Sequence, residues 1–199
     1  MVYSNISMID QKGVPYPYKR WERSHCYSGW VFKELLLENF IPSPTVLLRK
    51  KCLEKVGLFD SQLDLAEDWD LWLRISYQFR LYYIDKALAL YRWREHSPEY
   101  LLLLTESCWK ILVKLLSNRL IDQSLYPVWK KSFLKHTTKI LFYSYDLLRI
   151  SKVKKYFWES IKISPTLSLH WCLWRWLLKS LLGERMVKTF RDLKTRVQT

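Results

Sequence analysis

Three carboxylates crowd four consecutive positions near the middle of the chain. Glu67, Asp68 and Asp70 stand where residues 68–79 begin to show apolar side chains close to helical period. Carboxylates at a helix start are stabilised by its free backbone N–H groups and by the positive end of its dipole. The cluster is therefore either an acidic helix cap or a group that performs chemistry, and the residues alone leave both interpretations open.

Asp68 is the carboxylate whose surroundings suit a general base. The helix start favours its ionised form, and Trp69 and Trp72 could supply an apolar wall beside it. A carboxylate placed in this way can accept the proton of a hydroxyl while that hydroxyl attacks an electrophile. Because aspartate is a weak base for a free alcohol, the proton must move late in a concerted displacement, so position matters more than pKa.

The surrounding patterns predict strands and helices mixed in the first half of the chain and helices alone in the second. The expected strands are residues 1–10, 45–48 and 81–91, and the expected helices of the first half are residues 29–39, 52–56 and 68–79. Gly57 has the position of a helix C-cap glycine. Residues 14–28 have the composition of a loop, and the second half is expected to contain helices at 99–118, 126–150, 151–163 and 168–182 and a basic tail at 184–199.

Four segments of the first half resemble family 2 glycosyltransferases in both order and spacing. They are residues 41–50, 53–60 and 67–74 and the pair Tyr91-Arg92. The Glu-Asp pair alone is not a specific motif, whereas four segments in the family's order are specific. The resemblance extends over residues 1–97.

The resemblance implies an α/β fold, a partial GT-A (Rossmann-like) domain at residues 1–97, followed by a basic, aromatic-rich α-helical extension at 98–199. It implies inverting transfer of a sugar from a nucleotide-sugar donor to a hydroxyl of a glycan or lipid-linked acceptor. Asp68 matches the family's general base, Glu67 would shape the acceptor pocket, and Trp69 would stack on a sugar face. Arg74 lies on the same expected helix and either pairs with a carboxylate or binds ligand.

The segment around Tyr91 adds three candidate substrate-binding residues. Arg92 belongs to the matched pair, and Arg94 stands where the family usually has a histidine. An arginine at that position could contact a diphosphate. His96 either substitutes for the family's histidine or is a solvated loop residue.

The resemblance also implies a donor-binding half, with its own metal-binding Asp-x-Asp, that these residues do not include. We therefore expect a fragment that is inactive by itself. The complete enzyme is expected to use a divalent metal, Mg²⁺ or Mn²⁺, whose main ligands lie outside this chain. Asp68-Trp69-Asp70 is a literal Asp-x-Asp, but it stands inside the acceptor-side motif, so we assign no metal site to it.

Basic charge is concentrated in the second half of the chain. Residues 1–97 carry 14 Lys/Arg and 12 Asp/Glu, whereas residues 98–199 carry 19 and 7. Lysines interleaved with aromatic residues there allow nucleic-acid binding, peripheral attachment to an anionic membrane, or a helical appendix with a solvated basic face. No recognised nucleic-acid-binding module accompanies the pattern, so no nucleic-acid partner is expected. The alternative to an enzyme is a non-enzymatic helical module that binds an anionic membrane surface or a protein partner.

The cysteines and the apolar runs bear on the compartment. The four cysteines form no CxxC pair, which is typical of a reduced cytosolic protein, and they are Cys26, Cys52, Cys108 and Cys172. The first ten residues show no secretory-signal pattern. The run nearest to a membrane span, residues 166–183, is interrupted by three polar or basic residues, namely His170, Arg175 and Lys179. We expect a cytoplasmic protein, with peripheral attachment at the inner face of the membrane as a further option.

Overall fold

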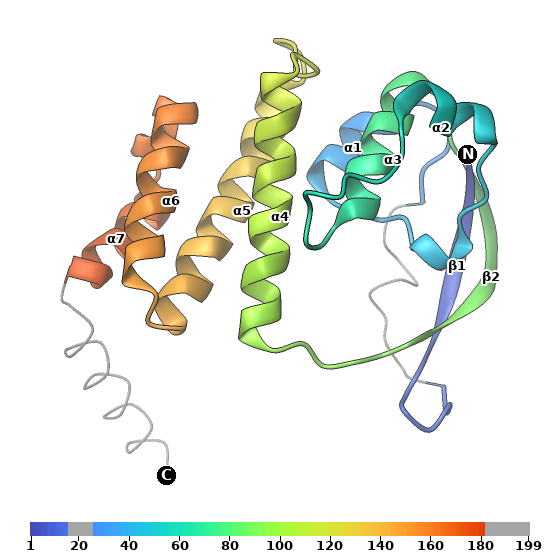
Figure 1. Cartoon of the computed structure of the whole chain (residues 1–199), viewed down its shortest axis with the longest axis horizontal. Coiled ribbons are helices and arrows are strands. Elements are labelled where there is room, and N and C mark those ends of the chain that lie inside the picture. The colour runs from blue at the N-terminus through green and yellow to red at the C-terminus, as the bar shows by residue number, and fades with distance from the viewer. Residues whose placement is uncertain (16–25, 182–199) are drawn as a thin grey trace. The chain divides into compact units, whose positions relative to one another are not determined.

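The computed structural model describes residues 1–15 and 26–181. The chain divides into a unit of mixed helices and strands, Met1–His96, and a helical unit that begins at Ser97. The elements of the first unit are β1 (Val2–Ile9), α1 (Phe32–Leu37), the 3₁₀ helix η1 (Ser43–Thr45), α2 (Lys50–Val56), α3 (Glu67–Gln78) and β2 (Tyr82–Arg92) (Figure 1). Those of the second unit are α4 (Pro98–Ser117), α5 (Tyr126–Asp146), α6 (Ile150–Ile163), the 3₁₀ helix η2 (Pro165–Leu169) and α7 (Trp171–Leu181).

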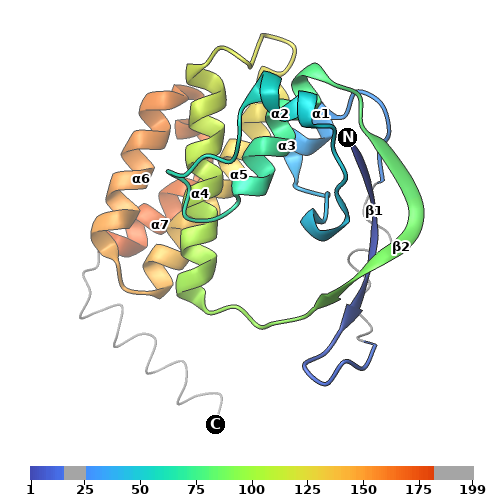
Figure 2. The same cartoon turned by 45° about the vertical axis from the view of Figure 1, so that its right-hand side comes forward.

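The first unit is built around two parallel strands. β1 pairs with β2 from Val2–Tyr82 to Ile9–Arg92, with irregular register around Asn5. Parallel strands require a long crossover, and here α1, α2 and α3 lie within it. Figures 1 and 2 show these helices gathered on one side of the strand pair. The expectation of a mixed α/β unit is confirmed at this level.

The two strands differ in how much of their surface is covered. β1 buries Tyr3, Ile6 and Met8 against the first unit's core. In β2, by contrast, Leu88 and Leu90 are 62% and 69% exposed. Parallel strands with apolar residues on both faces are normally covered on both sides. β2 therefore has the composition of a covered strand, and the described residues leave much of its apolar surface open.

One of the strands predicted for the first unit does not form. Residues 45–48 do not form a strand: Ser43–Thr45 is the 3₁₀ helix η1, and Leu47 alone makes a bridge to Val2. Pro42 and Pro44 explain the difference, because proline fixes φ and removes a backbone donor just where a ladder would have to begin. The other expected elements of this unit are confirmed to within a few residues at their ends.

The cap expected at the end of α2 is also confirmed. Gly57 is the C-cap of α2 and has φ 84°, which a residue with a side chain rarely adopts. Part of the expected loop, residues 16–25, and the expected basic tail at 184–199 lie outside the described residues.

The helices of the second unit are held together by buried aromatic residues with satisfied polar tips. Trp129 of α5 is fully buried, donates its indole N–H to the carbonyl of Leu112 at 2.9 Å, and stacks on Phe133 with ring centroids 4.7 Å apart. Trp109 of α4 donates to the Ser160 hydroxyl of α6 at 3.0 Å. Tryptophan suits such positions because it buries a large apolar area and still finds an acceptor for its N–H.

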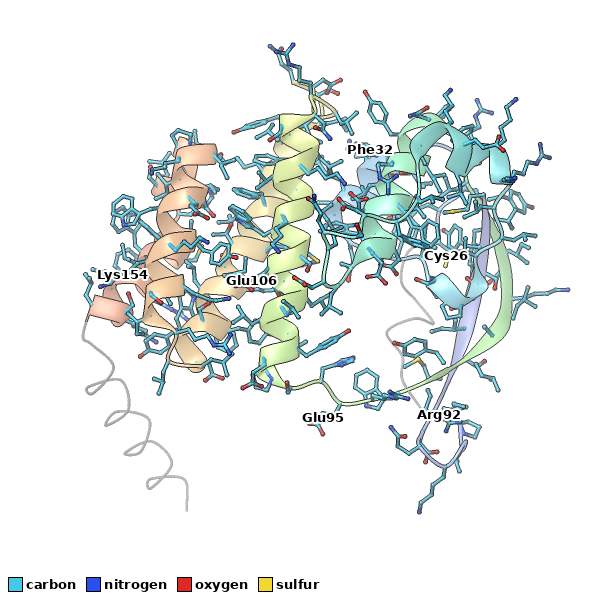
Figure 3. The ribbon with its side chains drawn as sticks, in the orientation of Figure 1. Cys26, Phe32, Arg92, Glu95, Glu106 and Lys154 are labelled. Atoms are coloured by element: carbon cyan, nitrogen blue, oxygen red, sulfur yellow. The ribbon has the colours of Figure 1, made fainter. Side chains whose placement is uncertain are left out.

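An ion pair adds a second link between α4 and α6. The Lys152 Nζ donates to Glu106 Oε1 at 2.5 Å, and Figure 3 labels Glu106 on α4. The helices expected at 99–118, 126–150 and 151–163 are confirmed, whereas the one expected at 168–182 begins only at Trp171, after η2. Of the four cysteines, Cys52 and Cys108 are buried, whereas Cys26 and Cys172 are exposed.

None of the helices in the described part of the chain combines the length and the apolar composition needed to cross a membrane.

The protonation of one histidine in the second unit should make the stability of the folded protein depend on pH. Burial, and then the charges of Lys139 and Lys135, lower the pKa of His136 to about 3. The unfolded chain therefore binds a proton that the folded chain does not, and stability is lost as pH falls below the ordinary histidine pKa of about 6.5. We expect a loss of up to about 1.4 kcal/mol per pH unit below that value.

The measurement is urea denaturation at pH 7 and pH 5.5, compared with a His136→Gln variant. The variant should show a smaller loss of stability between the two pH values than the wild type. Equal losses in the two proteins would contradict the assignment to His136.

Candidate functional site

Asp68 is the second residue of α3, and three donors hold its carboxylate. Oδ1 accepts hydrogen bonds from the Trp69 backbone N–H at 2.6 Å and from Asn39 Nδ2 at 3.3 Å. Oδ2 accepts a hydrogen bond from the Ser43 hydroxyl. The side chain is half-buried, and the N-cap residue before the acidic cluster, Ala66, has φ 60° in the left-handed region. The carboxylate is thus fixed in orientation while part of it remains open to solvent.

The two side-chain donors come from one segment, residues 39–45, which follows α1, includes η1 and is called here the 39–45 loop. Thr45 anchors the loop to β1, because its hydroxyl donates to the carbonyl of Ser4 and accepts from the Ser4 N–H, both at 3.1 Å. Asn39 Oδ1 accepts the N–H of Ile41 at 3.3 Å within the loop. The loop therefore connects the strand directly to the start of the helix that carries Asp68.

Burial raises the pKa of the Asp68 carboxyl above its ordinary value. The Ser43 hydroxyl and the Trp69 backbone N–H oppose this shift, because both stabilise the ionised form, whereas the nearby Glu67 charge adds to it. The sequence argument expected the helix start to favour the ionised carboxylate. The structure adds a larger opposing cause, the loss of water around a half-buried group, and a carboxylate with a raised pKa is the stronger base.

Asp70, only two residues further on, serves the fold. Its side chain is 1% exposed, its Oδ2 accepts a hydrogen bond from Arg74 Nε at 2.9 Å, and Arg74 Nη2 lies 2.8 Å from the same oxygen in an ion pair. Arg74 also donates to the carbonyls of Val56 at 2.5 Å and Leu58 at 2.8 Å. Of the two roles open to Arg74 from sequence, pairing with a carboxylate is the one observed. The guanidinium ties α3 to the turn at the end of α2.

The literal Asp-x-Asp does not fit a metal ion. Residues two apart on a helix do not share a face, and the carboxylate of Asp70 is bound by Arg74. Within residues 1–15 and 26–181, no three histidine, cysteine or carboxylate side chains are grouped as metal ligands.

Trp69 does not have the position that its expected role requires. The indole is 2% exposed, and its N–H donates to the carbonyl of Leu35 at 2.8 Å, which links α3 to α1. A ring with both faces packed cannot also stack on a sugar. The expectation of a stacking surface is therefore wrong for Trp69, whereas Glu67 is exposed at the helix start as a pocket-shaping residue would be.

The three candidates from the end of β2 are not brought to Asp68. Arg92 Nη1 donates to the carbonyls of Asp10 at 2.7 Å and Gln11 at 2.9 Å, so it closes the turn after β1. Arg94 and His96 are exposed in the segment that follows β2. Figure 3 labels Arg92, at the end of β2, and Glu95, in the segment after it, both clearly apart from the helix that carries Asp68. The next serine, Ser97, caps α4 by accepting the N–H of Tyr100 at 3.2 Å.

Two residues of the site, Asn39 and Ser43, were not identified as site residues from the sequence. Ser43 lies in one of the segments that carry the family resemblance, residues 41–50, and Asn39 lies just before it, but neither residue type suggests a catalytic role by itself. The available signal was a short polar side chain on each side of a proline in a loop before an acidic helix start. Such side chains commonly bond to a nearby carboxylate or backbone group.

The Arg74–Asp70 pair should contribute strongly to the stability of the first unit. Arg74→Met leaves a buried charged carboxylate without its partner, so we expect the free energy of unfolding to fall by about 3–5 kcal/mol. Urea denaturation followed by circular dichroism measures the change. As the matched control, Asp70→Leu combined with Arg74→Met should recover most of the loss, because no unpaired charge remains. A loss below about 1 kcal/mol in the single variant would contradict a buried pair.

Asp68 should make stability depend on pH in a defined direction. Because its folded pKa is raised, the folded state holds the proton more tightly than the unfolded chain, so this carboxyl lowers stability as pH rises through and above the ordinary aspartate value. Relative to wild type, Asp68→Asn should gain stability between pH 3 and pH 7, measured by urea denaturation. Lost hydrogen bonds shift the variant's stability by a constant amount, so the pH-dependent difference is the readout. A constant difference across this range would contradict the raised pKa.

No protein-family model, no curated protein and no solved structure matches this chain. The function must therefore be inferred from the residues around Asp68.

Proposed function

We propose that the first unit is the acceptor-side part of a GT-A-type, family 2 inverting glycosyltransferase, and that Asp68 is its general base. The observation that carries the proposal is the half-buried Asp68 carboxylate, oriented by Ser43 and Asn39 and raised in pKa by burial. The order of the motifs at residues 41–50, 53–60 and 67–74 is the reason for proposing this family. Two of these segments, which are distant in sequence, meet at this one carboxylate through the Ser43–Asp68 hydrogen bond.

The proposed chemistry uses the remaining hydrogen-bonding capacity of Oδ2. A carboxylate oxygen has two lone pairs, and Ser43 uses one of those on Oδ2. An acceptor hydroxyl donates its hydrogen to the other. As its oxygen forms a bond to the anomeric carbon of the donor sugar, the bond to the nucleoside diphosphate breaks, and the proton passes to Asp68. Attack from the face opposite the leaving group inverts the anomeric centre.

A donor-binding segment must complete this reaction. The open apolar surface of β2, where Leu88 and Leu90 are largely exposed, supports the proposal that further polypeptide covers this sheet in the active enzyme. We propose that this polypeptide binds the nucleotide-sugar and the divalent metal. Glu67, exposed beside Asp68, would face the acceptor.

The test is a transfer assay on protein expressed with an affinity tag from its native locus, so that any accompanying donor-binding polypeptide is purified with it. Release of nucleoside diphosphate from a panel of UDP-, GDP- and dTDP-sugars is measured with glycan and lipid-linked acceptors. Asp68→Asn keeps the size of the side chain but cannot take up the proton. We expect kcat to fall by about 10²–10⁴-fold while the donor KM stays the same.

Asp64→Asn is the matched control, since Asp64 is an exposed carboxylate four residues earlier and outside the site. It should leave kcat unchanged. An unchanged kcat in Asp68→Asn would remove Asp68 from the role of base. Failure to release nucleoside diphosphate from any donor in the wild-type preparation would reject the transferase itself.

A further inference from the structure

The outer face of α7 and the turn before it carry large apolar side chains in solvent. Leu169 is 84% exposed, Trp171 67%, Leu178 46% and Leu181 60%. With Arg175 they form what is called here the Trp171 face. Single exposed apolar residues are ordinary, but several along one short helix indicate a surface that something covers.

The opposite side of α7 is already used by the fold. Leu173, Trp176 and Leu177 are buried in the helical unit, and Trp174 donates its indole N–H to the carbonyl of Ser168 at 2.7 Å. Thus α7 packs one apolar side into the unit and still presents apolar residues on the other. A helix that is apolar all round is normally enclosed on all sides.

Within α7 and the segment just before it, the charge is of one sign. From residue 160 to residue 181 the chain has no aspartate or glutamate, whereas it has three basic residues, Lys162, Arg175 and Lys179. The Arg175 guanidinium lies 4.8 Å from the Trp176 ring centroid, and Lys179 Nζ lies 4.9 Å from it. The cations therefore alternate with the apolar side chains along α7 instead of occupying a separate face.

The basic surface continues onto α5. Phe142 is 42% exposed and packs edge-on against Trp176 at 5.4 Å, so the end of α5 lies beside α7. Along α5, Lys131, Lys135 and Lys139 precede Phe142 at helical spacing, and all three are exposed. On α6, too, an exposed aromatic residue follows an exposed lysine. Trp158 is 51% exposed, and Lys154 points away from the helical unit (Figure 3).

We propose that the Trp171 face docks α7 lengthwise on an anionic lipid bilayer. Tryptophan and leucine enter the boundary between headgroups and acyl chains, and the flanking lysines and arginine bind lipid phosphates at headgroup level. A nucleic acid would match the cations but would leave the leucines without a partner. A bilayer takes up apolar side chains that alternate with cations, because each cation reaches the headgroups beside the buried leucine or tryptophan.

The test is flotation of the purified full chain with vesicles. One set is pure phosphatidylcholine and the other contains about one-third phosphatidylglycerol. We expect the chain to float with the anionic vesicles and to remain behind with the neutral ones. Raising the salt to about 0.5 M should weaken the binding, since exposed charges are then screened.

Two variants separate the apolar and charged contributions. Trp171→Ala should weaken vesicle binding about ten-fold, because it removes the largest exposed apolar side chain of the face. Arg175→Gln should weaken it about five-fold, the effect of one basic residue at an anionic surface. Trp30→Ala is the matched control, since Trp30 is 60% exposed on the first unit and should leave binding unchanged. Circular dichroism of each variant checks that the helices remain.

Three results would overturn the proposal. One is no flotation with anionic vesicles, and another is equal flotation with neutral ones. The third is that the chain self-associates in sedimentation velocity, and that Trp171→Ala abolishes this oligomer but leaves vesicle binding unchanged. That third result would assign the face to contact between copies of this chain. None of these outcomes depends on the transferase proposal, because lipid binding is measured without donor or acceptor.

Discussion

A single guanidinium fixes where the candidate site can be. Arg74 bonds to the buried Asp70 on its own helix and to two backbone carbonyls on either side of Gly57. These bonds set the angle between α3 and the end of α2, and so they set the place where α3 begins. Asp68 lies at that beginning. The position of the proposed base therefore depends on a residue with no chemical role of its own.

Two aspartates two positions apart illustrate how a fold assigns different uses to the same side chain. Asp70 points into the protein and meets a cation, which compensates for its loss of water. Asp68 is half-buried and meets only neutral donors, from Ser43, Asn39 and the Trp69 backbone. Neutral donors orient a carboxylate without neutralising it, so Asp68 retains the charge and the raised pKa that a proton acceptor needs.

Most helices and both strands of the pair could be predicted because their apolar residues repeat at helical or strand spacing. The α3 helix and the glycine cap at Gly57 are examples. The strand expected at 45–48 was wrong because two nearby prolines override local apolar composition. Trp69 was misjudged because sequence gives the type of a side chain at a helix start but not which side of the helix is packed.

The site itself was predictable only in part. Asp68 could be named as a candidate because an acidic helix start is a local pattern. Its partners Asn39 and Ser43 lie 29 and 25 residues earlier, and nothing local connects them to it. Arg92 had the position expected in the chain but uses two of its hydrogen bonds to close a turn. Contacts between distant segments follow from the path of the chain, which spacing alone does not give.

Through the hydrogen bond between Ser43 and Asp68, the 39–45 loop is also directly coupled to the protonation state of the carboxylate. Once Oδ2 carries a proton, it becomes a donor, and the Ser43 hydroxyl can answer by rotating to accept. Asn39 has no such freedom, because its Nδ2 donates only and its Oδ1 already accepts the N–H of Ile41. A change in the protonation of Asp68 is therefore expected to alter the hydrogen bond at Ser43 and to leave the one at Asn39 as it is.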